Sequence, residues 1–295
     1  MFLARYKRSR IVRAYPWPAT AARAWAPAMA VRLSIWWHAF LAIAFAILPG
    51  QWRSLLAAAI GNHLLLGGLG MWPRSALLGR NLSRLPHACH GTPLVALTFD
   101  DGPDPEVTPQ VLDLLDQHDA KASFFCIGKR AAAFPHIVTE IVRRGHSVEN
   151  HSNSHPISFA FFSLAALRRD VHRSQVTLAE ISGSSPQFFR APFGLRSPLL
   201  DPVMAAEHLA YVSWTRRGYD GVSGSPKNIL RRLTHRLAAG DILLLHDTGM
   251  SRTTCGTPVV LDVLPRLLEM LDAAGLRAVS LPLALAETPM PPPPS

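Results

Sequence analysis

The stretch Leu94–Pro103 reads LVALTFDDGP, an apolar run that stops abruptly at Asp100 and Asp101. The apolar part predicts a buried strand, and the Gly-Pro pair that follows predicts a turn. Two adjacent carboxylates at the end of a strand repel each other unless a positive charge lies beside them. The pair therefore implies a cation, or the ligands of one, elsewhere in the chain.

A candidate for that partner follows about fifty residues later, where His151 and His155 flank Ser-Asn-Ser. One carboxylate and two histidines make a three-ligand set for a catalytic Zn²⁺, which keeps a position open for water. The second carboxylate is then free to act as a base. Each motif also has a simpler interpretation, because Asp-Asp-Gly-Pro is common in turns and such a histidine pair is common in solvated loops.

From Leu94 onward the sequence alternates between strand and helix patterns. We predict strands at 94–100, 122–127, 146–151, 187–191, 210–214, 241–246 and 277–281. Helical patterns lie between them, at 107–118, 130–144, 163–182, 197–208, 226–239 and 258–274. Repeated β-α units imply parallel strands, and seven of them predict a barrel or near-barrel of the α/β class.

Candidate catalytic groups fall at the carboxyl ends of four different predicted strands, where a βα barrel carries its chemistry. These groups are Asp100-Asp101, His151 with His155, the run from Arg190 to Gly194, and the run from Leu244 to Asp247. Each alone could be structural, but their convergence on one face of a barrel is hard to explain by stability alone.

The first seventy residues have a different character. Residues 1–32 are basic, and two uncharged stretches follow, at 33–52 and 54–73, separated by Arg53. Each is about long enough to cross a bilayer, for which roughly 20 residues suffice. Tryptophans near the ends are typical of membrane interfaces. The alternatives are buried helices of a soluble domain or a cleaved signal peptide, although no clear cleavage site follows the first stretch.

The charge distribution predicts where the catalytic part lies. The net charge is +10, but the basic residues cluster before and just after the apolar stretches, so we expect a membrane partner and no nucleic acid. If both stretches span, positive charges on either side place both chain ends in the cytoplasm; if only the first spans, the catalytic domain is outside. We expect the cytoplasmic (inner) membrane, with the catalytic domain on the cytoplasmic side.

These patterns divide the chain into five parts. We expect a basic segment at 1–32, membrane-embedded segments at 33–73, a linker at 74–91, a catalytic domain at 92–285 and a disordered proline-rich tail at 286–295. The three cysteines are far apart and suggest neither a disulfide framework nor a CxxC metal site. No protein partner is evident.

Four motifs resemble those of the polysaccharide deacetylases, the NodB-homology group or carbohydrate esterase family 4. They are Thr98–Pro103, His151–His155, Arg190–Gly194 and Leu244–His246, and the resemblance covers roughly residues 92–285. It implies a distorted (β/α)₇ barrel that hydrolyses the N-acetyl group of a sugar with the help of a divalent metal. Zn²⁺ would be the first choice, with Co²⁺, Ni²⁺ or Mn²⁺ as alternatives.

The resemblance also implies roles for single residues. Asp101, His151 and His155 would bind the metal, and Asp100 would be the base. The remaining implied roles are an oxyanion contact from the Phe193 N–H, protonation of the leaving amine by His246, a Leu244 pocket for the acetyl methyl, and pairing of Arg190 with Asp100.

The family's fourth motif, usually Asp-x-x-Asp-Trp, is altered in this chain. Arg217 stands at its first Asp and Gly221 at its Trp. Arg217 puts the support of His246 in doubt unless Asp220 or Asp247 provides it. Arg217 could instead bind an anionic substrate group such as phosphate, or simply point to solvent.

We therefore expect an N-deacetylase whose partner is an N-acetylated envelope glycan or a lipid-linked amino sugar. O-deacetylation or deformylation by the same centre stays open, as does non-haem iron chemistry on the same ligands. The alternative of another class is a membrane-anchored glycan-binding protein with a silenced site.

Overall fold

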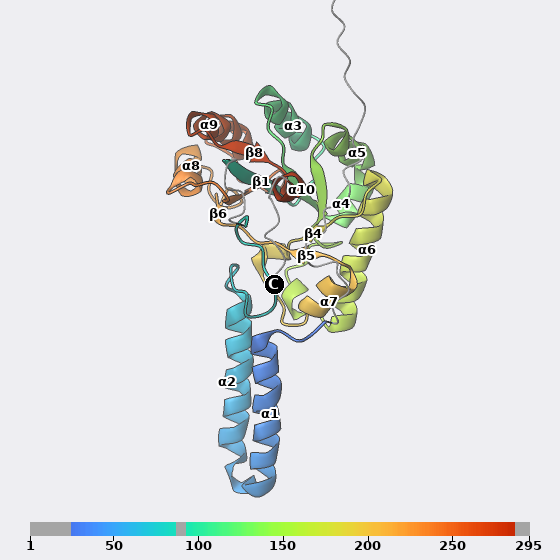
Figure 1. Cartoon of the computed structure of the whole chain (residues 1–295), viewed down its shortest axis with the longest axis vertical. Helices are drawn as coiled ribbons and strands as arrows, with labels where there is room; N and C mark the ends of the chain where they lie inside the picture. Colours follow the sequence, from blue (N-terminus) through green and yellow to red (C-terminus); the bar gives the residue numbers. More distant parts are fainter. Residues whose placement is uncertain (1–24, 87–92, 287–295) are drawn as a thin grey trace, which may run out of the picture.

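The computed structural model describes residues 25–86 and 93–286. The expectations for the basic segment before residue 25 and for the tail after residue 286 lie outside the described residues. Figure 1 shows two parts, a domain of strands and helices and a helical hairpin that projects from it.

Eight short parallel strands form one sheet in the domain. Their order is β5-β4-β3-β2-β1-β7-β6, and β8 pairs with the first half of β1. The sheet is an open, distorted barrel, as expected, because β5 and β6 do not pair with each other. The strands are β1 (Leu94–Asp100), β2 (Ser123–Cys126), β3 (Ser147–Asn150), β4 (Phe188–Phe189), β5 (Ala210–Tyr211), β6 (Arg216–Arg217), β7 (Ile242–His246) and β8 (Arg277–Val279).

The longer helices pack side by side in the order α8, α9, α3, α5 and α6 around the sheet (Figure 1). Every residue of β1 is buried, as expected for a strand covered on both faces. The domain helices are α3 (Val107–Gln117), α4 (Gly128–Ala133), α5 (Pro135–Arg143), α6 (Leu164–Ser182), α7 (Asp201–Ala206), α8 (Pro226–Thr234), α9 (Val259–Ala273) and α10 (Leu281–Ala286).

The predicted pattern differs from the structure in three places. The helix expected at 130–144 is two helices, because Pro135 cannot continue α4 and begins α5 instead. The strand β6 was not predicted, since two arginines carry no apolar pattern. The helix α10 was not predicted either, because its start was assigned to the preceding strand.

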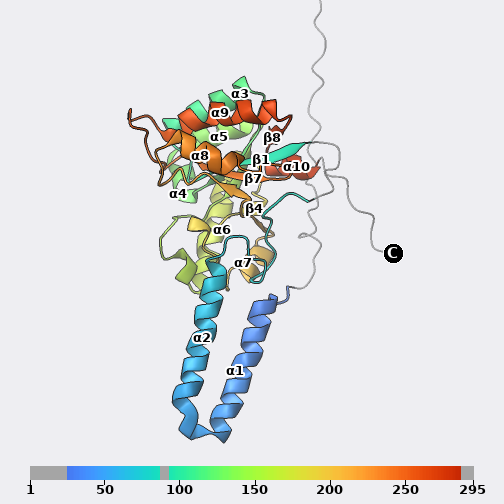
Figure 2. The same ribbon diagram turned by 90° about the vertical axis from the view of Figure 1, so that its left-hand side faces the viewer.

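The hairpin consists of α1 (Met29–Ile47) and α2 (Trp52–Gly70), joined by the short turn η1 (Pro49–Gln51). Figure 2 shows the two helices running antiparallel, with their turn far from the domain. Among the described residues, only α1 is long and apolar enough to be a possible membrane segment by length and composition. The two helices do not meet at Arg53, because α1 ends at Ile47, just before Leu48 and Pro49, and Arg53 is the second residue of α2.

Polar contacts join the two hairpin helices. Asn62 donates a hydrogen bond to the hydroxyl of Ser34 (2.7 Å), and the rings of His38 and His63 meet edge to face. Most of the large apolar side chains on α1 face outward, and Trp36 is 73% exposed. The hairpin therefore presents an apolar surface that the domain does not cover.

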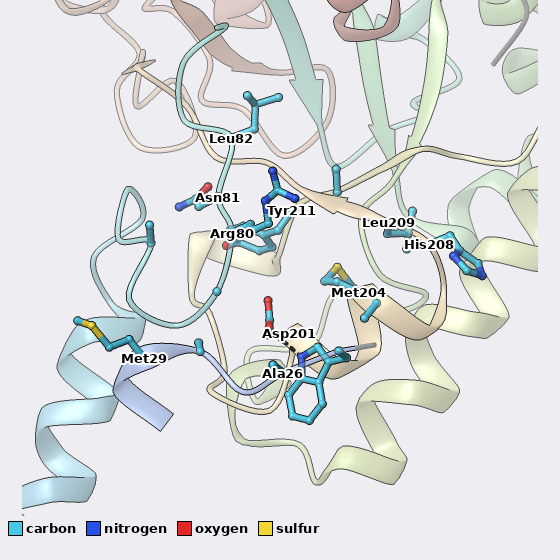
Figure 3. Close-up of a pocket in the computed structure, with 16 residues that line it drawn as sticks. Ala26, Met29, Arg80, Asn81, Leu82, Asp201, Met204, His208, Leu209 and Tyr211 are labelled. Atoms are coloured by element: carbon cyan, nitrogen blue, oxygen red, sulfur yellow. Dashed lines mark hydrogen bonds between the residues drawn. The ribbon is translucent and has the colours of Figure 1, made fainter. Parts of the chain in front are cut away.

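The base of the hairpin is fixed to the domain beside α7. The indole of Trp25 donates to Asp201 (2.9 Å), and the backbone N–H of Arg196 donates to the carbonyl of Gly70 (2.9 Å). Trp25 and Asp201 both line a pocket of about 840 Å³ at this junction, which Figure 3 shows with Asp201 below Tyr211. Contacts at both ends of the hairpin hold it in a defined place on the domain.

The segment expected as a linker, at 74–91, packs against the domain in its described part. Leu78, Leu82 and Leu85 are buried, and Leu82 forms a parallel bridge with Val212, directly after β5. The described part of this segment thus extends the open edge of the sheet and covers the core beneath it.

Candidate active site

The first strand brings the two carboxylates to the site. Asp100 is the last residue of β1 and pairs in register with His246 of β7. Asp101 follows with a left-handed backbone (φ 76°), which lets the chain leave the sheet immediately after Asp100. The base and acid expected from the sequence are therefore neighbours at the carboxyl edge of the sheet.

Asp101, His151 and His155 form a cluster that could hold a metal ion. One carboxylate oxygen of Asp101 lies 3.2 Å from Nε2 of His151 and 3.1 Å from Nε2 of His155. The three ligand atoms lie within 4.8 Å of one another. Burial lowers the pKa of His155 to about 4, and the neighbouring His151 adds to this effect, so the imidazole of His155 is neutral and can offer a lone pair.

Hydrogen bonds hold the histidines in a ligating orientation. His151 donates from Nδ1 to the carbonyl of Arg190 (2.8 Å), which leaves its Nε2 lone pair facing Asp101. The loop between the histidines is held by Asp170 of α6, which accepts from the Asn153 N–H (2.8 Å) and from the Ser154 hydroxyl (3.0 Å). No local pattern in the sequence indicates Asp170, which lies fifteen residues beyond His155.

Arg190 lies behind the site and is completely buried. Its guanidinium donates to Asp100 (2.5 Å), to the Thr98 hydroxyl (3.0 Å) and to the Ser213 carbonyl (3.0 Å). The Phe125 ring covers it at 4.1 Å. This arrangement fixes one oxygen of Asp100 and places a positive charge beside it, in the pairing that the family resemblance implies.

His246 has a carboxylate partner despite the altered fourth motif. Asp220 accepts from His246 Nδ1 (2.8 Å) and from the His246 backbone N–H (2.7 Å). Burial lowers the pKa of His246, but the charge and hydrogen bond of Asp220 outweigh it and raise the pKa to about 9. Of the two alternatives open from the sequence, Asp220 and not Asp247 contacts the imidazole.

Asp247 is a buried carboxyl with a different environment. It accepts a hydrogen bond from the Thr108 hydroxyl (2.5 Å), on the first turn of α3. Burial raises the pKa of Asp247 to about 7, although Thr108 opposes the shift. It therefore links the end of β7 to the first turn of α3.

Arg217 lies at the rim of the site, in β6, paired in register with Leu244 of β7. Its guanidinium lies between the rings of Trp214 (5.1 Å) and Tyr219 (5.0 Å). It does not point freely into solvent. Gly221, which replaces the family's Trp, borders open space, so this wall of the pocket is open.

These groups line one pocket of about 200 Å³. Eight of the nine residues singled out from the sequence line it, and the ninth, Arg190, lies beneath. Phe193 has a left-handed backbone (φ 59°), and its ring lies 4.6 Å from that of His155. The lining residues are Asp100, Asp101, His151, His155, Phe193, Gly194, Trp214, Arg217, Gly221, Val222, Leu244, His246 and Gly249. A carboxylate held by an arginine, a possible metal cluster and a charged histidine around one pocket are suited to hydrolysis.

Comparison with known proteins agrees with this geometry. Residues 87–212 match the family model described as polysaccharide deacetylase. A peptidoglycan-N-acetylglucosamine deacetylase of Bacillus cereus is 34% identical over 196 residues, which are 64% of this chain and 66% of that protein. A chitooligosaccharide deacetylase of Sinorhizobium fredii is 36% identical over 172 residues, 56% of this chain and 77% of that protein.

A solved structure supports the same assignment. The family 4 carbohydrate esterase from Streptomyces lividans, in complex with acetate, aligns with a TM-score of 0.57 and 31% identity. The alignment covers 63% of this chain and 91% of that one. From its motifs, its fold and these relatives, the chain belongs to the polysaccharide deacetylase family, whose members are hydrolases acting on carbon–nitrogen bonds other than peptide bonds.

Proposed function

We propose that this protein is a metal-dependent deacetylase that removes the N-acetyl group of an amino sugar in an envelope or lipid-linked glycan. The observation that carries the proposal is the convergence of Asp101, His151 and His155 with Asp100 and His246 in one pocket. The relatives described above act on peptidoglycan N-acetylglucosamine and on chitooligosaccharide, which supports an N-acetylated glycan as substrate.

The donor set suits a divalent metal. The Asp101 oxygen that faces both histidines is buried and has no hydrogen-bond partner among the described residues. Because His151 donates from Nδ1, its Nε2 carries a lone pair and faces that oxygen at 3.2 Å. Two acceptors this close are suited to sharing a cation, and Zn²⁺ accepts such a nitrogen and oxygen set. When bound, the metal supplies an activated water and polarises the acetamide carbonyl.

The remaining residues handle protons and charge. Asp100, whose carboxylate accepts a hydrogen bond from Arg190, takes a proton from the attacking water. His246 is charged at neutral pH and gives a proton to the departing amine. The buried Leu244 offers an apolar contact for the acetyl methyl group, and the Phe193 N–H is the candidate donor to the oxyanion.

We further propose that the hairpin anchors the protein in the cytoplasmic membrane, with the domain in the cytoplasm. The ends of the hairpin that join the domain carry Arg32, Arg74 and Arg80, whereas the turn carries only Arg53. This asymmetry follows the positive-inside rule. In a Cys89→Ser variant, the exposed thiol of Cys255 should react with an impermeant maleimide only after cells are permeabilised. Labelling in intact cells would contradict this orientation.

The reaction is tested with a panel of acyl donors. Detergent-solubilised, Zn²⁺-loaded protein should release acetate and a free amine from N-acetylated glycans or lipid-linked amino sugars. O-acetylated and N-formylated analogues tested in competition separate the esterase and deformylase alternatives. Release of neither acetate nor formate from any member of the panel would refute the proposal.

A further inference from the structure

A second pocket, of about 500 Å³, adjoins the active site. We call it the arginine pocket, and its lining residues are Arg74, Trp214, Thr215, Arg216, Arg217, Tyr219, Arg231, Arg232 and His235. Trp214 and Arg217 line both pockets. The two pockets therefore meet at these two side chains.

Most of the positive charge in the arginine pocket is not neutralised. Arg216 pairs with Asp241 (2.6 Å). Among the described residues, no carboxylate forms an ion pair with Arg74, Arg217, Arg231 or Arg232, and the lining contains no acidic residue. Arginines gathered without acidic partners repel one another, and a bound anion relieves that repulsion.

Two of these arginines, Arg217 and Arg232, lie against aromatic rings and not against acids. The guanidinium of Arg217 lies between Trp214 and Tyr219, and its Nε is buried without a hydrogen-bond partner among the described residues. Arg232 lies 5.5 Å from the Tyr219 ring and donates to the Gly218 carbonyl (3.3 Å). Stacking leaves the edge of a guanidinium free to donate two parallel hydrogen bonds, which suits the oxygens of a phosphate.

The place of the pocket fits a substrate that comes from the membrane. Arg74 follows the end of α2 by four residues, so the arginine pocket lies near the base of the hairpin. In a protein anchored by that hairpin, a phosphate in this pocket would lie close to the bilayer surface. A sugar attached to that phosphate would extend toward Asp100 and His246.

We propose that the arginine pocket binds the phosphate or diphosphate group of the substrate, an N-acetylated amino sugar carried on a phosphate ester. This inference rests on the proposed function, since it places the acetamide of the same molecule at the metal cluster. Arg217 contacts both parts of the substrate, and Arg231 and Arg232 of α8 hold the outer phosphate oxygens.

The test compares two substrates that differ only in phosphate. One is N-acetylglucosamine joined to a short prenyl chain through a diphosphate, and the other is the same sugar joined directly to that chain as a glycoside. The full metal-loaded chain in detergent should have a kcat/KM at least tenfold higher for the diphosphate. The double variant R231Q/R232Q should lower this ratio by about tenfold or more, because it removes two charged donors to phosphate.

The matched control is R168Q/R169Q, an exposed arginine pair on α6 with no ion pair among the described residues. It removes the same charge and should leave the ratio unchanged. A wild-type ratio near one would overturn the inference. An equal fall of the kcat/KM ratio in both double variants would also overturn the inference. The preference for the diphosphate would then come from the net positive charge of the protein and not from the arginine pocket.

A binding measurement separates this inference from the proposed function. In metal-free protein, inorganic phosphate should bind by calorimetry, and R231Q/R232Q should lose that binding while R168Q/R169Q keeps it. If no substrate yields acetate, the proposed function fails. The calorimetric titration still shows whether the arginine pocket binds phosphate. If R231Q/R232Q weakens binding to phosphatidylglycerol vesicles without changing the substrate ratio, the pocket serves a membrane lipid and the substrate assignment is wrong.

Discussion

Replacing Asp220 by Asn tests whether this residue compensates for the altered fourth motif. Asp220 contacts His246 twice, at the imidazole and at the backbone N–H. Asn keeps the size and one acceptor oxygen but removes the negative charge. Burial then acts without opposition from Asp220, so the pKa of His246 should fall sharply.

The size of the effect follows from the pKa of His246, which is raised from 6.5 to about 9. A difference of about 2.5 pH units corresponds to roughly 3.4 kcal/mol between the two protonation states. With a pKa of about 9, roughly nine-tenths of His246 is protonated near pH 8. With a pKa of 6.5 or lower, only about 3% is protonated there, so we expect a roughly 30-fold loss of kcat/KM.

The assay is the pH profile of kcat/KM for acetate release, since this profile reports the ionisations of the free enzyme. In Asp220→Asn, the basic limb of the profile should shift to lower pH by about two pH units or more. The kcat/KM values of the two proteins should converge toward pH 6. Asp247→Asn is the matched control, because Asp247 is also buried but does not contact the imidazole. A uniform loss across all pH values, or the same shift in both variants, would refute the reasoning.

Three further predictions concern the metal and the stability. His155→Ala should weaken Zn²⁺ binding by more than the roughly 10–100-fold that loss of an outer-shell partner costs, as measured by chelator competition. Burial raises the pKa of Glu149 to about 7 although the Gln187 and Phe188 N–H groups oppose it. Ionisation of Glu149 is therefore disfavoured in the folded protein. The free energy of unfolding should fall by about 3 kcal/mol as the pH rises from about 4.5 to 7. Glu149→Gln should abolish that dependence in urea titrations across this pH range, and an unchanged slope would contradict the assignment. In Gly194→Ala, the new Cβ would lie 2.3 Å from Trp214 at φ 73°, so unfolding free energy should fall by about 1–3 kcal/mol, and an unchanged urea midpoint would contradict this.

Most of the site could be predicted because its residues follow buried strands. Asp100, His151 and His246 are marked by the apolar runs before them, and parallel strands bring such ends to one edge. Asp170 could not be assigned in this way, because its role depends on how α6 packs over that edge. Asp220 was one of two candidates beside the altered fourth motif, and only the fold shows that it, and not Asp247, contacts His246.

The arginine pocket shows the same limit of sequence analysis. Arg74 and Arg231 are more than 150 residues apart in the chain, and only the fold brings them to one pocket. The charge of Arg217 was visible, but its place between two aromatic rings was not. In the hairpin, the Pro-Gly pair at Pro49 marks the turn, but charge alone does not reveal it, because residues 33–52 contain no charged side chain.

The most direct test of the central claim is acetate release by wild-type protein and by Asp100→Asn at equal, measured Zn²⁺ content. Wild-type protein should release acetate from an N-acetylated glycan and lose this activity on chelation. Asp100→Asn should retain the metal and lose activity by a factor of at least about 100, as expected when a general base is removed. Equal rates in the two proteins, or release that survives chelation, would contradict the account.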